Sequence, residues 1–378
     1  MLLEPTLIRA LPLSNRAVMS PMTRNRAVEA STPNALMAEY DGQRATAGLI
    51  VTEGTSPSPN GLGYPRIPGL FNAAQVQGWK LVTDAVHAKG GRIVLQLMHT
   101  GRVTHAANLP AGAEIVGPLA SACPGQMYTD AQGMQDHGTP RAMTEADIAH
   151  AVAEYAQSAR LAIEAGFDGV ELHAANGYLI EQFMNPIVNT RTDAYGGSIE
   201  GRNRFALDVA RAAAQAIGAD KVGIRLLPYG VFNSTGAYPD VDAQYLALVD
   251  ELSAIGLMYV HLLDHSAMGA PPVPASLKAA VDDAFKGGAD PGRRFRPGQR
   301  GSGLGGRPRR SHRTRPAFPG QPRSGGAHAH GRRPQRRGHE HLLHARSQGL
   351  HRLPDARRLT RCAWPNGTAA PASRPRGR

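Results

Sequence analysis

Side chains suited to catalysis recur along the first 286 residues, each just after a short apolar stretch. They offer hydroxyl, carboxylate, amide, imidazole and guanidinium groups, and they are Thr23, Glu53, Gln96, His99, His173, Arg225, Asp264 and His265. Asn176 and Tyr178 follow His173 closely, so three polar side chains share one loop. Such groups could hold a polar ligand, donate to developing charge or move a proton. On spacing alone, a helix-capping His and Asn beside a core Tyr is the more common explanation.

Metal binding is the alternative chemistry for the histidines, which also include His99 and His105. His261 and His265 have the i, i+4 spacing that binds zinc on a helix, but here it spans an expected strand end and loop. No carboxylate-rich cluster or cysteine pair accompanies them. We therefore expect no metal site.

The apolar stretches are rich in Val, Ile and Leu, as in parallel strands that are buried on both faces. The expected strands are 16–22, 48–52, 92–99, 169–173, 221–227 and 258–263. Helical patterns lie between them. The clearest begins at a Thr144–Asp147 capping box and stops at Gly166, and others end at Gly90 and Gly256. A last helix is expected over 277–285.

Six strand-then-helix units predict a parallel α/β fold. The polar groups at the strand ends favour a (β/α)8 TIM barrel, because barrel enzymes gather their sites at the C-terminal strand ends. A Rossmann sheet would show G-x-G-x-x-G after its first strand, and none follows Met22. We thus predict an incomplete TIM-barrel domain over 1–286, with six of eight units. Residues 100–144 are too long for a plain connection and are expected to form a lid or small hairpin over the barrel mouth.

The formal charge of +12, from 42 Lys+Arg against 30 Asp+Glu, comes from the last quarter of the chain. Residues 287–378 hold 22 Arg, no Lys and three acids, which leaves 20 basic and 27 acidic residues in 1–286. Arg, Gly and Pro fill 49 of these 92 positions, and no apolar periodicity remains. We expect this tail to be disordered. It could bind nucleic acid, act as a low-complexity linker, or be an out-of-frame translation of a GC-rich gene.

The genetic code favours the out-of-frame interpretation. Read one nucleotide later, 289–296 permits L-I-L-A-G-G-F-D, 315–325 permits G-R-P-F-L-A-N-P-D-L-V, and 340–356 permits N-T-F-Y-T-P-G-A-K-G-Y-T-D-Y-P-T-L. These strings fall in one frame and in a barrel-like order, which places the frameshift near 287–288. Nucleic-acid binding is ranked last because the tail lacks interleaved aromatics, with Phe295, Phe318 and Trp364 as the candidates.

Composition also bears on location. Two cysteines cannot form a disulfide framework, the start of the chain lacks the order of a signal peptide, and no apolar run reaches about 18 residues. We expect a cytoplasmic protein with a small-molecule substrate and neither a nucleic-acid nor a membrane partner. The oligomeric state stays open.

The chain from about residue 3 to 286 resembles the old yellow enzyme family of FMN-dependent alkene reductases. The resemblance rests on Met19-Ser-Pro-Met-Thr-Arg24, Thr52-Glu-Gly-Thr55 with Gly61-Leu-Gly-Tyr64, Leu95-Gln-Leu-Met-His-Thr-Gly-Arg102, Glu171-Leu-His-Ala-Ala-Asn-Gly-Tyr178, Asn185-Pro186 with Asn189-Thr-Arg-Thr-Asp-Ala-Tyr-Gly-Gly-Ser198, and Gly223-Ile-Arg-Leu226. It implies a TIM barrel with bound FMN that takes hydride from NAD(P)H and reduces enones, maleimides or nitro compounds by a ping-pong mechanism.

The resemblance also implies which residues hold the flavin. Arg225 would supply the positive charge near flavin N1 and O2, a role that suits a permanently charged guanidinium. Gln96 would pair with the uracil-like edge, and Thr23 would place its hydroxyl near O4. Backbone groups of Pro21, Met22 and Gly54 would complete the contact.

The substrate residues follow in the same way. His173 and Asn176 resemble the family pair that hydrogen-bonds a carbonyl or nitro oxygen, where such a donor contributes roughly 3 kcal/mol as charge develops. Tyr178 would deliver a proton to the alkene carbon.

The sequence departs from the family pattern at several places. Gly54 stands where Ala is frequent, Met98 where Trp is expected, Leu227 where Ser is common, and Gly201 where Asn is expected. None of these removes a proposed catalytic group. The family segments that form the last two strands and hold the FMN phosphate are found only in the shifted frame, so an inactive product without FMN is the alternative expectation.

Overall fold

The computed structural model describes residues 2–286. The expected disorder of the basic tail and the proposed change of frame concern residues 287–378, which lie outside the described residues.

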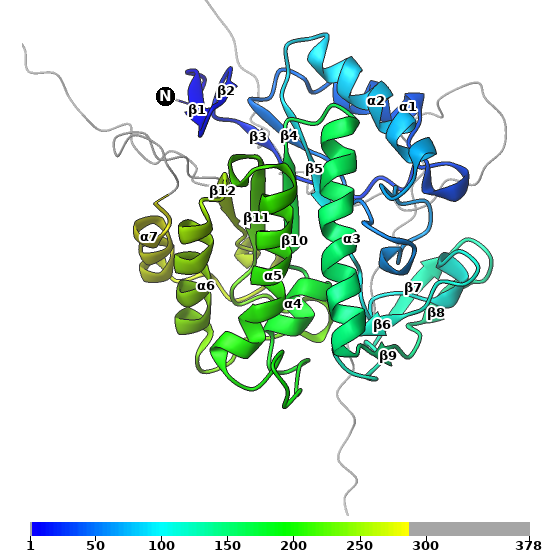
Figure 1. Cartoon of the computed structure of the whole chain (residues 1–378), viewed down its shortest axis with the longest axis vertical. Coiled ribbons are helices and arrows are strands. Elements are labelled where there is room, and N and C mark those ends of the chain that lie inside the picture. Colours follow the sequence, from blue (N-terminus) through cyan, green and yellow to red (C-terminus); the bar gives the residue numbers. More distant parts are fainter. Residues whose placement is uncertain (1, 287–378) are drawn as a thin grey trace, which may run out of the picture. The chain divides into compact units, whose positions relative to one another are not determined.

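Six parallel strands form one sheet, a half-barrel in which each strand pairs with the one before it (Figure 1). They are β3 (Val18–Met19), β4 (Leu49–Val51), β5 (Ile93–Leu97), β10 (Val170–Ala174), β11 (Val222–Leu226) and β12 (Tyr259–Leu262). A doubly wound sheet reverses its strand order at a switch point, whereas a barrel keeps sequential order. All six expected strands are confirmed, with ends that differ by one to three residues, and their order is that of a barrel.

Helices cover the outer face of this sheet, and in Figure 1 α3 and α5 lie in front of the strands while α6 and α7 lie to their left. The helices are α1 (Ala35–Gly42), α2 (Ala73–His87), α3 (Glu145–Glu164), α4 (Leu179–Met184), α5 (Ile199–Ile217), α6 (Val241–Ile255) and α7 (Ala275–Ala284). Leu95, Leu172 and Ile224 point outward from their strands and join the main apolar core with the buried faces of the helices. Burial of the sheet on both faces explains the near-continuous apolar runs in the sequence.

The best-defined helix boundary is the start of α3. Thr144 caps the helix by accepting from the Asp147 N–H, while the Asp147 carboxylate accepts from the Thr144 N–H, so the predicted capping box is confirmed. Gly166, with a φ of +90°, takes the chain out of the helix region just after α3. Ile148, Tyr155 and Ala159 are buried between these two signals.

An N-terminal hairpin, which the sequence did not lead us to expect, covers the N-terminal end of the inner face. It consists of β1 (Thr6–Ile8) and β2 (Leu11–Leu13), paired antiparallel. Its Arg9 Nη2 donates to the Leu257 carbonyl oxygen at 2.9 Å, just before β12. The buried side chains that the hairpin joins form one cluster: Ile8, Leu13, Leu49, Val51, Val94, Met258 and Tyr259.

The long segment after β5 contains the expected small hairpin. It holds β6 (Val116–Gly117), β7 (Gln126–Thr129), β8 (Gly133–Asp136) and β9 (Arg141–Ala142), with β7 and β8 antiparallel and β6 parallel to β9. Cys123 of this segment packs in one cluster with Met98, just after β5, and Tyr178, after β10. The segment therefore lies at the C-terminal ends of the strands, where a lid over the mouth was expected.

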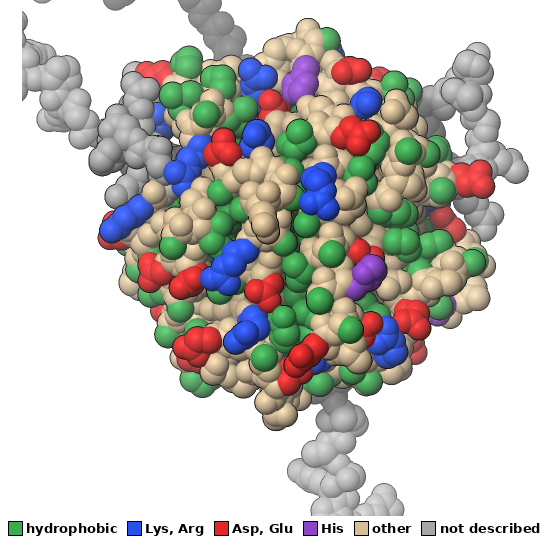
Figure 2. Space-filling view, in the orientation of Figure 1, with side chains coloured by type: hydrophobic (Ala, Val, Ile, Leu, Met, Phe, Trp, Pro, Cys, Tyr) green, Lys and Arg blue, Asp and Glu red, His purple; other side chains and the backbone are tan. Residues whose placement is uncertain are grey.

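Short 3-10 turns join these elements. They are Glu29–Ser31, Pro59–Gly61, Ala106–Asn108, Ala219–Lys221, Phe232–Ser234 and Ser266–Met268. On the face drawn in Figure 2, acidic and basic side chains are interspersed. Among the described helices, none is both long and apolar enough to span a membrane.

Candidate active site

The strand register brings three of the predicted site residues into one neighbourhood on the inner face. His173 of β10 lies opposite Arg225 of β11, and Arg225 lies opposite His261 of β12. Glu171 of β10 lies opposite Gln96 of β5. Because residues two apart on a strand share a face, Glu171 and His173 point to the same side. Gln96, His173 and Arg225 thus lie on the same face of neighbouring strands.

Several polar atoms in this neighbourhood are buried and have no hydrogen-bond partner within residues 2–286. They are His173 Nδ1, Arg225 Nε and Asn176 Oδ1. A buried polar atom without a partner costs about 1–3 kcal/mol, so such atoms usually meet a ligand or water. A flavin ring and a substrate oxygen carry donors and acceptors of the kind these atoms require. The residues present therefore fit a flavin together with a polar substrate.

Tyr178 contacts both His173 and a second tyrosine. The His173 and Tyr178 rings meet edge to face at 5.0 Å between centroids, and the Tyr178 and Tyr64 hydroxyls are 3.1 Å apart. Burial, and then Tyr64, raise the pKa of Tyr178 well above its usual value. Burial, and then the Arg225 charge, lower the pKa of His173 well below its usual value. At neutral pH, Tyr178 is therefore protonated and His173 is neutral.

The loop that carries Asn176 is fixed by its neighbours. Asn176 adopts a φ of +61°, a left-handed conformation that Asn tolerates better than most residues. Its carbonyl oxygen accepts from Asn233 Nδ2 at 2.7 Å, and the next N–H, of Gly177, donates to Glu181 Oε2 at 2.6 Å. Burial raises the pKa of Glu181 to about 8. Asn176 and Tyr178 therefore lie on a loop held by these hydrogen bonds, directly after His173 in β10.

The other predicted flavin residues lie at the ends of β3 and β4. Pro21, Met22 and Thr23 follow β3 in irregular backbone, and Met22 and Thr23 are exposed. Glu53 holds this loop to the end of β4, because its Oε2 accepts from the Arg24 N–H at 2.8 Å and the Asn25 N–H at 3.3 Å.

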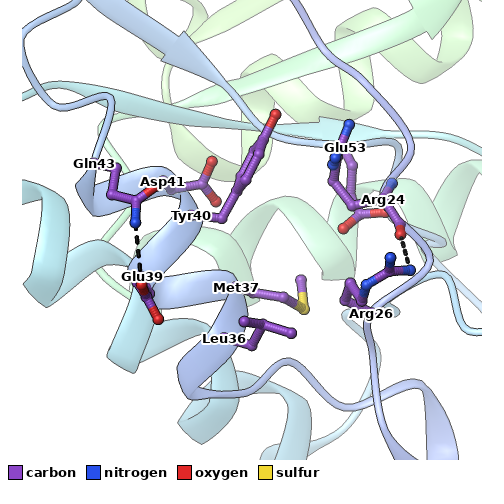
Figure 3. A pocket seen from close by; sticks show the side chains of 9 residues that line it. All are labelled: Arg24, Arg26, Leu36, Met37, Glu39, Tyr40, Asp41, Gln43 and Glu53. Carbon is purple, nitrogen blue, oxygen red and sulfur yellow. Dashed lines mark hydrogen bonds between the residues drawn. The ribbon is translucent and has the colours of Figure 1, made fainter. Parts of the chain in front are cut away.

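A cavity lies beside this junction. Figure 3 shows Arg24, Arg26 and Glu53 on one side of it, with Tyr40 and Asp41 of α1 on the other. Burial raises the pKa of both Asp41 and Glu53 to about 7. None of the predicted site residues lines this cavity, although Arg24 directly follows Thr23 and Glu53 directly precedes Gly54.

Two of the departures from the family pattern fit together in space. A Cβ added at Gly54 would lie 2.5 Å from Met98 Sδ, so Met98 occupies the space that a larger residue at position 54 would need. At Gly201, a Cβ would lie 2.1 Å from the Gly196 carbonyl oxygen, which explains a glycine at that position. Nothing in the structure explains Leu227, which is buried.

Three further residues of the inner face, Glu171, Tyr259 and His261, were not among the predicted flavin or substrate residues. The Glu171 carboxylate accepts from Gln96 Nε2 at 2.7 Å and from the Tyr259 hydroxyl at 3.1 Å, and it pairs with His261 Nδ1 at 3.0 Å. Glu171 is fully buried. The signal was present, because an acid two residues before His173 in an apolar run must share the inner face of the strand. Within the described residues, no group of three His, Cys, Asp or Glu side chains could hold a metal ion.

A family profile and several known proteins resemble this chain, and all of them indicate the same family. The profile of the NADH:flavin oxidoreductase / NADH oxidase family matches residues 1–273. The chain is 44% identical over 279 residues to chanoclavine-I aldehyde reductase of Penicillium roqueforti, with 73% of each chain covered. It is 44% identical over 250 residues to a probable flavin mononucleotide-dependent alkene reductase of Leishmania infantum, covering 65% of this chain and 67% of that one.

A solved structure agrees with these relatives. The old yellow enzyme homologue from Zymomonas mobilis superposes with a TM-score of 0.72 at 36% identity, covering 75% of this chain and 80% of that chain. The chain therefore belongs to the NADH:flavin oxidoreductase / NADH oxidase family, the old yellow enzyme family of FMN-dependent NAD(P)H oxidoreductases, as its motifs predicted.

Proposed function

We propose that this chain reduces activated alkenes, such as enones, maleimides and nitroalkenes, with hydride taken from NAD(P)H. The observation that carries the proposal is the set of buried polar atoms without partners on His173, Asn176 and Arg225, next to a protonated Tyr178. The ring nitrogen of His173 and Arg225 Nε can donate to ligand oxygens, Asn176 Oδ1 can accept from a ligand N–H, and Tyr178 can supply a proton to carbon.

The flavin would be held along the inner face and by the loops after β3 and β4. Arg225 and Gln96 would bind its pyrimidine edge, the Thr23 hydroxyl would lie near O4, and Pro21, Met22 and Gly54 would offer backbone groups. Bound FMN supplies hydride transfer, taken from NAD(P)H in one half of a ping-pong cycle and passed to the alkene in the other.

His173 and Asn176 would bind the carbonyl or nitro oxygen of the substrate. A neutral imidazole can donate one hydrogen bond, and the Asn176 amide can donate another. Charge that develops on the oxygen would then meet two fixed donors in a buried site, where one donor is worth roughly 3 kcal/mol. Tyr178, which keeps its proton at neutral pH, would protonate the carbon that does not receive hydride.

Measurement of the two half-reactions tests the proposal. The full chain, loaded with FMN, is expected to lose its yellow absorbance when NADPH is added without oxygen and to regain it when an enone is added. His173→Ala should slow the second step and leave the first largely unchanged. Reduction of the flavin with no reoxidation by any enone, maleimide or nitroalkene would contradict the proposal.

The alternative is an inactive frameshift product that cannot hold FMN. It is favoured by the end of the family match at residue 273 and by the shifted-frame motifs in 289–356. Purified chain that stays colourless after incubation with FMN would support this alternative. Retention of a tail-only fragment on DNA, lost at high salt, would instead support nucleic-acid binding.

A further inference from the structure

Glu171 occupies an unusual position for an acid, at the middle of the sheet and on its inner face. Its side chain is fully buried, and both carboxylate oxygens are hydrogen-bonded. Burial alone would raise the pKa of Glu171, yet His261, Arg225 and Gln96 outweigh burial and hold the pKa below its usual value. The group is therefore a charged carboxylate at neutral pH, and a charged carboxylate can only accept hydrogen bonds.

This chemistry determines which way the Gln96 side chain faces. Without a neighbour that only donates or only accepts hydrogen bonds, the Gln96 amide could be turned either way, because its oxygen and nitrogen ends have the same shape. Here one end lies 2.7 Å from Glu171 Oε1, and an acceptor-only partner requires that end to be the NH2 group. The Gln96 backbone is also fixed, because its N–H donates to Thr52 Oγ1 at 3.0 Å.

The outcome is a defined pattern of donor and acceptor on the side of the amide that does not contact Glu171. With one Nε2–H directed to Glu171, Gln96 has its carbonyl oxygen and its second N–H left for a ligand. The pyrimidine edge of a flavin presents an N–H between two carbonyl oxygens, so an acceptor next to a donor complements it. A reversed amide would place the carbonyl oxygen against the Glu171 carboxylate, where the two acceptors repel.

We propose that Glu171 is a positioning residue that fixes the orientation of the Gln96 amide, so that Gln96 presents its carbonyl oxygen and one N–H to the flavin pyrimidine. This inference rests on the proposed flavin site. Glu171 itself does not touch the flavin and acts through Gln96.

The first part of the test needs no flavin. The side-chain amide groups of glutamine are labelled with 15N in the full chain, and the Gln96 signal is identified by its loss in Gln96→Leu. Glu171→Gln and Glu171→Asp should both move this signal, because the first replaces the charged acceptor and the second withdraws it by one methylene. Tyr259→Phe is the matched control, since it removes a hydrogen bond from the other oxygen of the same carboxylate and should leave the Gln96 signal in place.

The second part measures the dissociation constant of FMN by quenching of flavin fluorescence. Glu171→Gln and Glu171→Asp are each expected to weaken binding about tenfold, which is the loss of one good hydrogen bond, while Tyr259→Phe should change it by less than about twofold. In a Gln96→Leu background, Glu171→Asp should have almost no further effect, because the residue through which it acts is gone. Circular dichroism of every variant confirms that it is folded.

The outcomes separate the two claims. The role of Glu171 is overturned if the wild-type chain binds FMN and neither Glu171→Gln nor Glu171→Asp changes the Gln96 signal or the FMN affinity. The proposed function then still stands. A wild-type chain that binds no FMN contradicts the proposed function, and the glutamine signal then decides the orientation of Gln96 alone. If Glu171→Gln weakens FMN binding and Glu171→Asp does not, only the negative charge beside Arg225 affects FMN binding. That result would also overturn the proposal.

Discussion

The two ends of the inner face of the sheet are built from the same strands and differ in polarity and charge. The N-terminal end is apolar, with Leu13 of the hairpin packed on Leu49, Val94 and their neighbours. The C-terminal end carries charged and polar groups, among them His173 and Arg225 with unpaired buried atoms. The contrast separates an apolar end that packs against the N-terminal hairpin from a polar end where we propose that a ligand binds.

The largest expected effect at the polar end follows the loss of one hydroxyl. Tyr178→Phe should slow reoxidation of the reduced enzyme by an enone about a thousandfold, since general acids contribute about 10²–10⁴-fold. Flavin reduction by NADPH should change little, because no proton is delivered in that step. Stopped-flow absorbance measures the two steps separately.

Tyr64→Phe is the control for this change. It removes the partner hydroxyl of Tyr178, 3.1 Å away, and keeps the proposed proton donor. Equal losses in the two variants would mean that the pair of hydroxyls, and not Tyr178 alone, delivers the proton.

At the apolar end, a truncation should affect stability and leave the chemistry intact. Leu13 is 2% exposed, and Leu13→Ala is expected to lower the free energy of unfolding by about 3 kcal/mol through lost burial and a cavity. Urea denaturation measures this value, and FMN affinity should stay the same. Leu7→Ala, on the same hairpin at a 54% exposed position, should cost less than about 0.5 kcal/mol. A large loss of FMN affinity in Leu13→Ala would break the proposed division between the two ends.

Replacement of Arg225 by lysine, which keeps the positive charge, tests the polar end of the inner face. Arg225→Lys should weaken FMN binding about tenfold, because an ammonium group cannot reproduce the fork of guanidinium donors and one charged hydrogen bond is worth about 1.5–3 kcal/mol. Arg92→Lys makes the same swap at the N-terminal end of β5, where Arg92 pairs with Asp168. Fluorescence titration with FMN should find the Arg92 variant unchanged, and equal weakening in both variants would argue against a specific role for Arg225.

The last effect concerns the cavity lined by Asp41 and Glu53. Burial raises the pKa of Asp41 from 3.8 to about 7, so the folded chain binds this proton more tightly than the unfolded chain does. The stability that Asp41 contributes is therefore full below pH 3.8 and is lost as the pH rises to about 7.

Asp41→Asn tests this pH dependence. Above pH 7 the variant should be more stable than wild type, and in acid the two should agree. Urea denaturation across this pH range measures the difference, with Glu39→Gln on the same helix as the control for loss of an exposed carboxylate. A gap between wild type and Asp41→Asn that does not change with pH would contradict this explanation.

Much of this arrangement could be predicted from the sequence, because it depends on local signals. The capping box at Thr144 and the apolar runs of the six strands act over a few residues, and the structure confirms both. The polar ends of those strands indicated which end of the sheet would carry His173 and Arg225.

Other features depend on contacts between distant segments. The hairpin that covers the apolar end joins residues 6–13 to Met258 and Tyr259, and nothing local in the sequence indicates that contact. The hydrogen bond between Glu171 and Gln96 links residues 75 positions apart and requires the strand register. Likewise, the contact between Met98 and Gly54 could not be predicted from the sequence, because it depends on the three-dimensional positions of both residues.

Titration of FMN into the full 378-residue chain tests most directly whether the polar end of the sheet is a flavin site. We expect saturable quenching of flavin fluorescence with one FMN bound per chain, and a clear loss of affinity in Arg225→Lys but not in Arg92→Lys. Absence of saturable binding by well-folded chain, or binding that Arg225→Lys leaves unchanged, would contradict this assignment.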